Sequence, residues 1–117
     1  MTEKSGRDLI DEAKARVKQV SAADSVKNPD PDIVYLDCRE ANEYALGHIP
    51  GAVFIPRGTM ETKVEAVIPR EKKVVIYCAS GNRSALAADT MQQMGYSDVA
   101  SMSGGFRGWV EAGGEVE

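Results

Sequence analysis

Four short runs of apolar residues divide the larger, C-terminal part of the chain, and turn-forming or polar residues bound each of them. The runs are Ile33–Leu36, Ala52–Ile55, Val74–Cys78 and Val99–Met102. Ile, Val, Tyr and Phe dominate most of these runs, and apolar residues follow one another directly instead of alternating with polar ones. Continuous short runs of this kind are typical of strands that are buried on both faces, as in a parallel sheet.

Segments with helical spacing lie before and between these runs. Over the first twenty residues, an amphipathic helix is predicted by the spacing of Leu9, Ile10, Ala13, Val17 and Val20 among charged residues. Ser21 is a suitable N-cap for a short helix over Ala22–Val26, and the Ala-rich segment Ser84–Met94 predicts another helix that ends at Gly95. Strands that alternate with helices favour an α/β fold with helices on both faces of the sheet. In such folds, ligands bind beyond the carboxyl ends of the strands.

Composition and charge exclude several classes of function. The 117 residues suit one domain, 43% of them are apolar, and the formal net charge is −4, whereas nucleic-acid binders normally carry a basic excess. Two cysteines, Cys38 and Cys78, and one histidine, His48, are too few for a disulfide framework or a Cys/His zinc site, so we expect no metal and no cofactor. No apolar run approaches the ~20 residues of a membrane span, and no export signal is recognisable. We therefore expect a cytoplasmic protein without membrane or nucleic-acid partners.

The segment after the third apolar run carries the strongest chemical signal. Cys78 ends the predicted strand, and the predicted helix begins six residues later. The loop between them contains small residues and Gly81, so its backbone N–H groups can turn inward beside the helix N-terminus and form a cradle for an anion. Arg83 adds a positive charge, and these features together favour a thiolate at Cys78. An arbitrary cysteine is more often a buried, inert thiol, but such a thiol has no need of Gly81 and Arg83 in a tight turn.

Several motifs in this order resemble those of single-domain rhodaneses. They are Asp37-Cys38-Arg39-Glu40, Glu43-Tyr44, Gly47-His48-Ile49-Pro50-Gly51-Ala52, Cys78-Ala79-Ser80-Gly81-Asn82-Arg83-Ser84, Gly104-Gly105 and Trp109. The resemblance implies the rhodanese-like α/β fold, with a central, mainly parallel five-stranded sheet flanked by helices on both faces. The resemblance begins at about Val20, so we expect a rhodanese-like domain over residues 19–117, preceded by the predicted helix as an N-terminal extension over residues 1–18.

The same resemblance implies roles around Cys78, which would carry sulfur and cycle between thiolate and persulfide. Substrate would be bound by the loop residues Ala79, Ser80, Gly81, Asn82, Arg83 and Ser84. Asp37 and Arg39 would support the site, although an ordinary ion pair that fixes the end of a strand explains them equally well. Only four residues separate Cys78 from Arg83. That is the sulfurtransferase spacing, whereas related phosphatase-type domains have a longer loop that forms a wider bowl for an oxyanion.

The function predicted from these residues is a two-step sulfur transfer. The Cys78 thiolate attacks the outer sulfur of thiosulfate or of a persulfide donor, and the persulfide then passes that sulfur to cyanide or to a thiol acceptor. Arg83, with Arg39 as a second candidate, would hold the anionic donor. The alternative is a persulfide carrier or protein-interaction module of rhodanese fold with little small-molecule turnover; the short loop disfavours a phosphatase or arsenate reductase. The expected partners are a small anionic sulfur donor and a thiol or protein acceptor, for a monomer or weak homodimer.

Other residues of the motifs have plainer interpretations. Cys38, where the family more often has an aliphatic residue, is expected to pack as a small hydrophobe, with a disulfide to the reactive cysteine as the minor alternative. His48 is expected to form hydrogen bonds within its turn, Glu43 to make a helix or turn contact, and Trp109 to pack in the core. Gly104-Gly105 either allows the backbone to approach the Cys78 loop closely or forms a plain turn.

Overall fold

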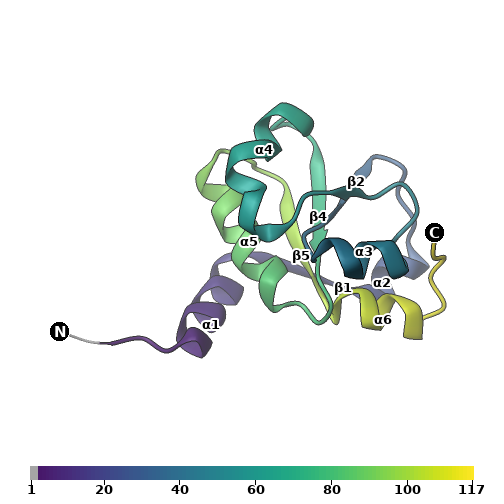
Figure 1. Ribbon diagram of the computed structural model, residues 1–117, viewed down its shortest axis with the longest axis horizontal. Helices are drawn as coiled ribbons and strands as arrows, with labels where there is room; N and C mark the ends of the chain where they lie inside the picture. Colours follow the sequence, from purple (N-terminus) through teal and green to yellow (C-terminus); the bar gives the residue numbers. More distant parts are fainter. Residues whose placement is uncertain (1–2) are drawn as a thin grey trace.

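A parallel sheet lies at the centre of the computed structural model, which describes residues 3–117 (Figure 1). Within these residues the sheet has five strands: β1 Lys18–Ser21, β2 Ile33–Asp37, β3 Val53–Phe54, β4 Lys73–Tyr77 and β5 Val99–Ser103. Their order is β1-β5-β4-β2-β3, and every neighbouring pair is parallel. The helices are α1 Gly6–Arg16, α2 Ala22–Lys27, α3 Ala41–Leu46, α4 Met60–Val67, α5 Asn82–Gln93 and α6 Gly105–Glu111, with a short 3-10 helix, η1, at Arg57–Thr59.

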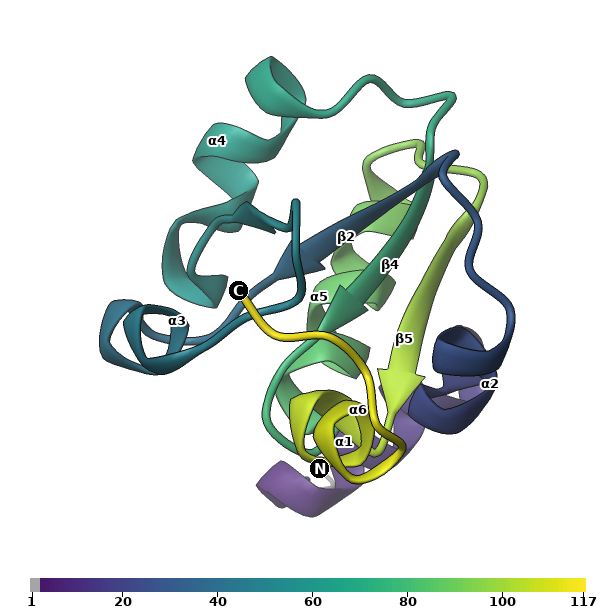
Figure 2. The same cartoon turned by 90° about the vertical axis from the view of Figure 1, so that its right-hand side faces the viewer.

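Helices cover both faces of the sheet, as the strand pattern predicted. α4 and α5 pack on one face and α1 packs against α5, whereas α2 and α6 contact each other on the opposite face (Figure 2). The predicted α/β fold with a five-stranded sheet is therefore confirmed, and the sheet is parallel throughout. No helix among residues 3–117 has the length and hydropathy that crossing a membrane requires.

Two apolar layers explain why the strands read as continuous apolar runs. Under α4 and α5, the sheet contributes side chains such as Leu36, Ile76 and Val99. Under α2 and α6, it contributes Val75, Met102 and their neighbours. Successive side chains of a strand point to opposite faces. A strand that is covered on both faces therefore needs apolar residues at consecutive positions, and not only at every second one.

The N-terminal segment differs from its prediction. α1 ends at Arg16, and Lys18–Ser21 forms the edge strand β1 beside β5, so the helix does not run through the first twenty residues. Val17 and Val20 have helical spacing, but they pack into the apolar layers on opposite faces of the sheet. The backbone of β5 needs a hydrogen-bonding partner along its outer edge, and this tertiary demand outweighs a weak helical pattern.

Element boundaries elsewhere move by a few residues. The short helix after Ser21 is confirmed, and the Asp24 N–H donates to the Ser21 Oγ over 3.0 Å. Of the predicted strand Ala52–Ile55, only Val53–Phe54 pairs with β2. α5 begins at Asn82, two residues before the predicted start at Ser84, so the loop that follows Cys78 is shorter than the sequence pattern indicated.

Candidate active site

The loop after β4 folds back onto the sulfur of Cys78. Cys78 directly follows the strand and is 1% exposed. Gly81 is the N-cap of α5 and has a φ of +112°, a conformation that favours glycine. Its N–H lies 3.0 Å from the Cys78 Sγ and donates to it. The chain therefore turns sharply enough to bring a backbone donor to the sulfur at the start of a helix.

The first residues of α6 hold this loop from its outer side. The Phe106 N–H donates to the Cys78 carbonyl oxygen over 2.7 Å, and the Arg107 N–H donates to the Ala79 carbonyl oxygen over 3.2 Å. A Cβ on Gly105, whose φ is +57°, would lie 2.6 Å from both of these oxygens. The interpretation of this glycine pair as a point of close backbone approach to the Cys78 loop is therefore confirmed at Gly105. Because α6 takes the carbonyl groups, the loop N–H groups are free to face the sulfur.

Hydrogen bonds make Cys78 more acidic than an ordinary thiol. Burial raises the pKa of its thiol, but the hydrogen bonds outweigh burial, so that the pKa lies below its usual value. These bonds come from the Ser84 hydroxyl, 3.6 Å from the Sγ, and from the backbone N–H groups of Ser84, Gly81 and Ser80. The Ser84 Oγ also lies 2.8 Å from the Ser101 Oγ on β5. Sequence reasoning missed Ser101, whose only signal is a polar residue within the apolar run Val99–Met102.

Arg83 forms an ion pair at the rim of the loop. Its Nη1 and Nη2 donate to the two carboxylate oxygens of Glu43 on α3, over 2.8 and 3.0 Å. The Arg83 hydrogen bond lowers the pKa of Glu43 to about 2, and the same pair raises the pKa of Arg83. Glu43 also accepts from the Glu40 N–H over 3.0 Å, so the expected helix contact is present. The pairing with Arg83 was not expected, and it leaves this guanidinium partly neutralised.

Asp37 and Arg39 form a buried ion pair on the α6 side of the sheet. The Arg39 Nη2 lies 2.7 Å from the Asp37 Oδ2 and 2.7 Å from the Gly47 carbonyl oxygen. The guanidinium also stacks over the Phe106 ring, 4.5 Å from its centroid. Arg39 is 5% exposed, and its Nε and Nη2 donate to Asp37 and Gly47. This burial disfavours Arg39 as a holder of the donor anion, and the ion pair links the Gly47 segment to the start of α6.

Cys38 occupies the position beside Cys78. β2 and β4 pair in register up to Asp37 and Tyr77, so the two cysteines are the next residues of adjacent strands, and both belong to the apolar layer under α5. Burial, and then the neighbouring Cys78, raise the pKa of the Cys38 thiol far above its usual range. This thiol packs in the core as expected. Its pKa is raised, whereas the pKa of Cys78 is lowered. A disulfide between the two cysteines remains the minor alternative, and both are free thiols in this structure.

His48 and Trp109 have the structural surroundings that the sequence indicated. The His48 Nδ1 lies 3.1 Å from the Tyr44 carbonyl oxygen, and its ring stacks on Tyr44 with 3.9 Å between centroids. Its Nε2 lies 3.2 Å from the Glu117 Oε1. Trp109 is buried, and its Nε1–H donates to the Glu115 carbonyl oxygen over 2.7 Å.

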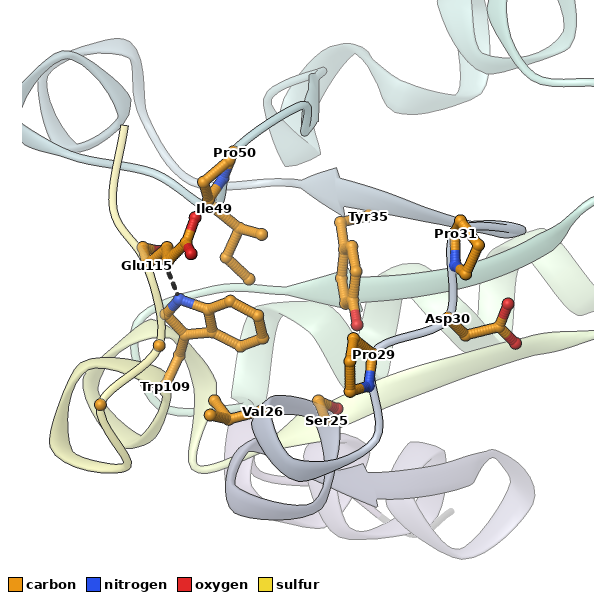
Figure 3. Close-up of a pocket in the computed structure, with 12 residues that line it drawn as sticks. Ser25, Val26, Pro29, Asp30, Pro31, Tyr35, Ile49, Pro50, Trp109 and Glu115 are labelled. Carbon is orange, nitrogen blue, oxygen red and sulfur yellow. Dashed lines mark hydrogen bonds between the residues drawn. The ribbon is translucent and has the colours of Figure 1, made fainter.

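A cavity of about 500 Å³ lies apart from this loop, on the face of the sheet that α2 and α6 cover. The residues that line it include Tyr35, Trp109, Ile49, Pro29 and Pro50 (Figure 3). None of residues 78–84 lines this cavity. Among residues 3–117, no three or more His, Cys, Asp or Glu side chains gather as a metal site would require.

Comparisons with known proteins agree with this geometry. The family model described as a rhodanese-like domain matches residues 18–112. Thiosulfate:glutathione sulfurtransferase of Saccharomyces cerevisiae is 32% identical over 98 residues, covering 74% of this chain and 70% of that protein. A Bacillus subtilis protein named as a candidate sulfur carrier is 39% identical over 80 residues, covering 68% of this chain. The match spans only 43% of that longer relative.

A solved structure is similar over the whole chain. It is a Rhodopseudomonas palustris protein of unknown function, described as a possible tyrosine phosphatase. It is 37% identical in sequence, has a TM-score of 0.88, and the match covers 100% of this chain and 97% of that one.

The first prediction concerns the rim ion pair. Arg83→Gln should return the pKa of Glu43 from about 2 toward its ordinary 4.5, because the guanidinium is the largest cause of the shift. Since the folded-state pKa lies below the unfolded one, the pair contributes stability above about pH 4.5 and loses it as the pH falls through about 2. Carbon-13 NMR titration of the Glu43 carboxyl measures the shift.

Arg57→Gln, which removes the partner of Glu61 instead, is the control. An unchanged Glu43 titration in Arg83→Gln would contradict this account.

The second prediction concerns the close approach of α6. Gly105→Ala should destabilise the fold by about 3 kcal/mol or more, because a Cβ there meets backbone atoms that cannot move aside. Gly51→Ala is the matched control, since Gly51 has a φ of +77° but open space around it, and it should cost only about 1 kcal/mol. Denaturant unfolding of both variants gives the two values. Equal losses would show that the contact with the Cys78 loop contributes nothing.

Proposed function

Because this chain belongs to the rhodanese-like domain family, we propose that it is a sulfurtransferase working through a persulfide on Cys78. The observation that carries the proposal is the buried Cys78 sulfur, which accepts the Gly81 N–H over 3.0 Å and has a pKa below the ordinary thiol value. Relatives named as sulfurtransferase and candidate sulfur carrier support sulfur transfer in general.

In the first half-reaction, Cys78 takes a sulfur atom from the donor. The Cys78 thiolate attacks the outer sulfur of thiosulfate, the sulfur–sulfur bond of the donor breaks, and sulfite leaves with the electron pair. A persulfide donor would release a thiolate in the same way. The new terminal sulfur on Cys78 is anionic, and inward-facing loop N–H groups stabilise it without having to reorganise. Ala79, Ser80, Gly81, Asn82, Arg83 and Ser84 are the proposed substrate-binding residues.

In the second half-reaction, the terminal sulfur moves to the acceptor. Cyanide or a thiolate attacks this outer sulfur, its bond to the Cys78 Sγ breaks, and the electron pair returns to the Sγ as thiolate. The same hydrogen bonds that favour the Cys78 thiolate as a nucleophile also favour it as a leaving group. One residue thus serves both steps, and the kinetics should be ping-pong.

One chain contains every residue used in these steps, so we propose that the protein acts as a monomer or weak homodimer. Cys38 and Cys78 are both free thiols, which suits a reducing compartment such as the cytoplasm. Asp37 and Arg39 are proposed as supporting residues. Asp37 holds the Arg39 guanidinium, which contacts Phe106 at the start of α6.

A persulfide carrier is the second candidate, and the Bacillus subtilis relative named as a candidate sulfur carrier favours it. A carrier would load one sulfur per chain from thiosulfate and then stall with cyanide or small thiols, whereas an enzyme would turn over repeatedly. The possible phosphatase activity described for the Rhodopseudomonas palustris protein is less well supported for this chain, because only four residues separate Cys78 from Arg83. Phosphomonoester hydrolysis that disappears in Cys78→Ser would favour that activity.

The third prediction tests the proposed nucleophile. Cys78→Ser should abolish thiocyanate formation from thiosulfate and cyanide, because a serine hydroxyl is not ionised at neutral pH and cannot form a persulfide. Cys38→Val is the matched control. It replaces a fully buried thiol with an apolar side chain and should retain most of the activity. Full activity in Cys78→Ser, or its loss in Cys38→Val alone, would overturn the assignment.

The fourth prediction tests whether Arg83 attracts the donor. Glu43→Gln removes the negative charge beside Arg83 and still leaves an oxygen to accept the Glu40 N–H. The KM for thiosulfate should fall about two- to fivefold, the range expected for a solvent-screened ion pair, with little change in kcat. Glu61→Gln, which disrupts the Arg57 pair instead, should leave the KM unchanged. A KM that rises in Glu43→Gln would show that the carboxylate helps the donor to bind.

A further inference from the structure

Two buried serines extend from Cys78 into the sheet. The Ser84 Oγ lies 3.6 Å from the Cys78 Sγ and 2.8 Å from the Ser101 Oγ, and both serines are fully buried. Ser101 lies on β5 opposite Ile76 of β4, on a face otherwise lined by residues such as Val99 and Ile76. A hydroxyl in such a layer is costly unless it has a hydrogen-bond partner. Ser84 supplies that partner, so any effect of Ser101 on Cys78 passes through the Ser84 hydroxyl.

We propose that Ser101 is a positioning residue for Cys78, because its hydroxyl orients the Ser84 hydroxyl toward the sulfur. The chain of contacts is Ser101 to Ser84 to Cys78, with no direct contact needed between its two ends. The consequence for thiol acidity stands independently, whereas the consequence for sulfur transfer rests on the proposed function.

The hydroxyls can serve both protonation states of Cys78 by rotating. In the thiol state, the S–H donates to the Ser84 Oγ and the Ser84 O–H donates to the Ser101 Oγ. In the thiolate state, the Ser84 O–H donates to the sulfur and the Ser101 O–H donates to the Ser84 Oγ. Each hydroxyl keeps a partner in both states, and in the second the two bonds point toward the negative charge and strengthen each other.

Without Ser101, the Ser84 hydroxyl has a competing partner. Ser84 lies in the first turn of α5, and a helical serine can rotate to donate to the carbonyl oxygen three or four residues earlier. For Ser84, these are the carbonyl groups of Gly81 and Ser80 in the loop. The Ser101 hydroxyl holds the Ser84 Oγ on the sheet side, where its proton can reach the sulfur.

Ionisable groups around Cys78 are left unchanged by substitutions at Ser101. Cys38 follows β2, and Arg83 on α5 interacts electrostatically with Cys78. Glu43 on α3 pairs with Arg83, and Arg107 at the start of α6 is exposed. β5 contributes no ionisable side chain. A change in the pKa of Cys78 on mutating Ser101 therefore does not come from the loss or gain of a charged side chain.

The effect should be visible in both half-reactions. A less stable Cys78 thiolate is a scarcer nucleophile at neutral pH and a poorer leaving group when an acceptor attacks the persulfide. Loss of the Ser101 hydroxyl should therefore slow both loading with sulfur and its release, without changing how the donor is bound.

The fifth prediction concerns the pKa of the Cys78 thiol. Iodoacetamide alkylation of Cys78, followed by mass spectrometry against pH, gives its pKa. Ser101→Ala should raise this pKa by about one unit, so that alkylation is about tenfold slower at pH values below it and unchanged where the thiol is fully ionised. Ser103→Ala is the control, since the Ser103 hydroxyl donates to the Val20 carbonyl oxygen and not to the loop. A Ser101→Ala profile equal to that of wild type would overturn the proposal.

A pair of nearly isosteric substitutions separates hydroxyl from packing. Ser101→Thr and Ser101→Val add similar bulk, but only threonine keeps the hydroxyl, so Thr should retain the wild-type pKa and Val should behave like Ala. Equal shifts in both would assign the effect to packing and contradict the proposal. Ser84→Ala should raise the pKa at least as much as Ser101→Ala, and the double variant no further than Ser84→Ala alone, because Ser101 acts through Ser84. Additive shifts would also contradict it. If wild-type Cys78 fails to load sulfur from thiosulfate, the proposed function fails, but these pKa tests still decide the role of Ser101.

Discussion

The hydrogen bonds from the start of α6 to the loop after β4 are the contact on which the site depends. The Phe106 and Arg107 N–H groups occupy the carbonyl oxygens of Cys78 and Ala79, and Gly105 allows the two backbones to lie this close. With its carbonyl groups turned outward, the loop presents N–H groups to the sulfur. The last helix of the chain thus determines the polarity of a loop that lies far from it in sequence.

Hydrogen bonds from the Ser84 hydroxyl and from backbone N–H groups lower the pKa of Cys78, and two arginines near the loop are held in ion pairs. Arg83 shares its charge with Glu43, and the Arg39 guanidinium is buried against Asp37 and Phe106. Adjacent cysteines in the same apolar layer consequently differ in acidity. Burial dominates at Cys38, whereas hydrogen bonds outweigh it at Cys78.

Much of this arrangement was predictable from the sequence, because it depends on local patterns. Continuous apolar runs predicted the buried parallel strands, and Gly81 in a short loop predicted the N–H cradle. Four features were not predictable, since each depends on pairing between distant segments. β1 forms only because β5 has an open edge. Glu43 contacts Arg83 only in the folded chain. Ser101 contacts Ser84 only where α5 packs on the sheet. The burial of Arg39 likewise follows from its contacts with Gly47 and Phe106.

The most direct test of the central claim is mass spectrometry of the intact protein after exposure to thiosulfate, with peptide mapping of the modified residue. We predict that the chain gains the mass of one sulfur atom on Cys78, and that cyanide removes it. No gain, or a gain located on Cys38, would contradict the assignment of Cys78 as the sulfur-carrying residue.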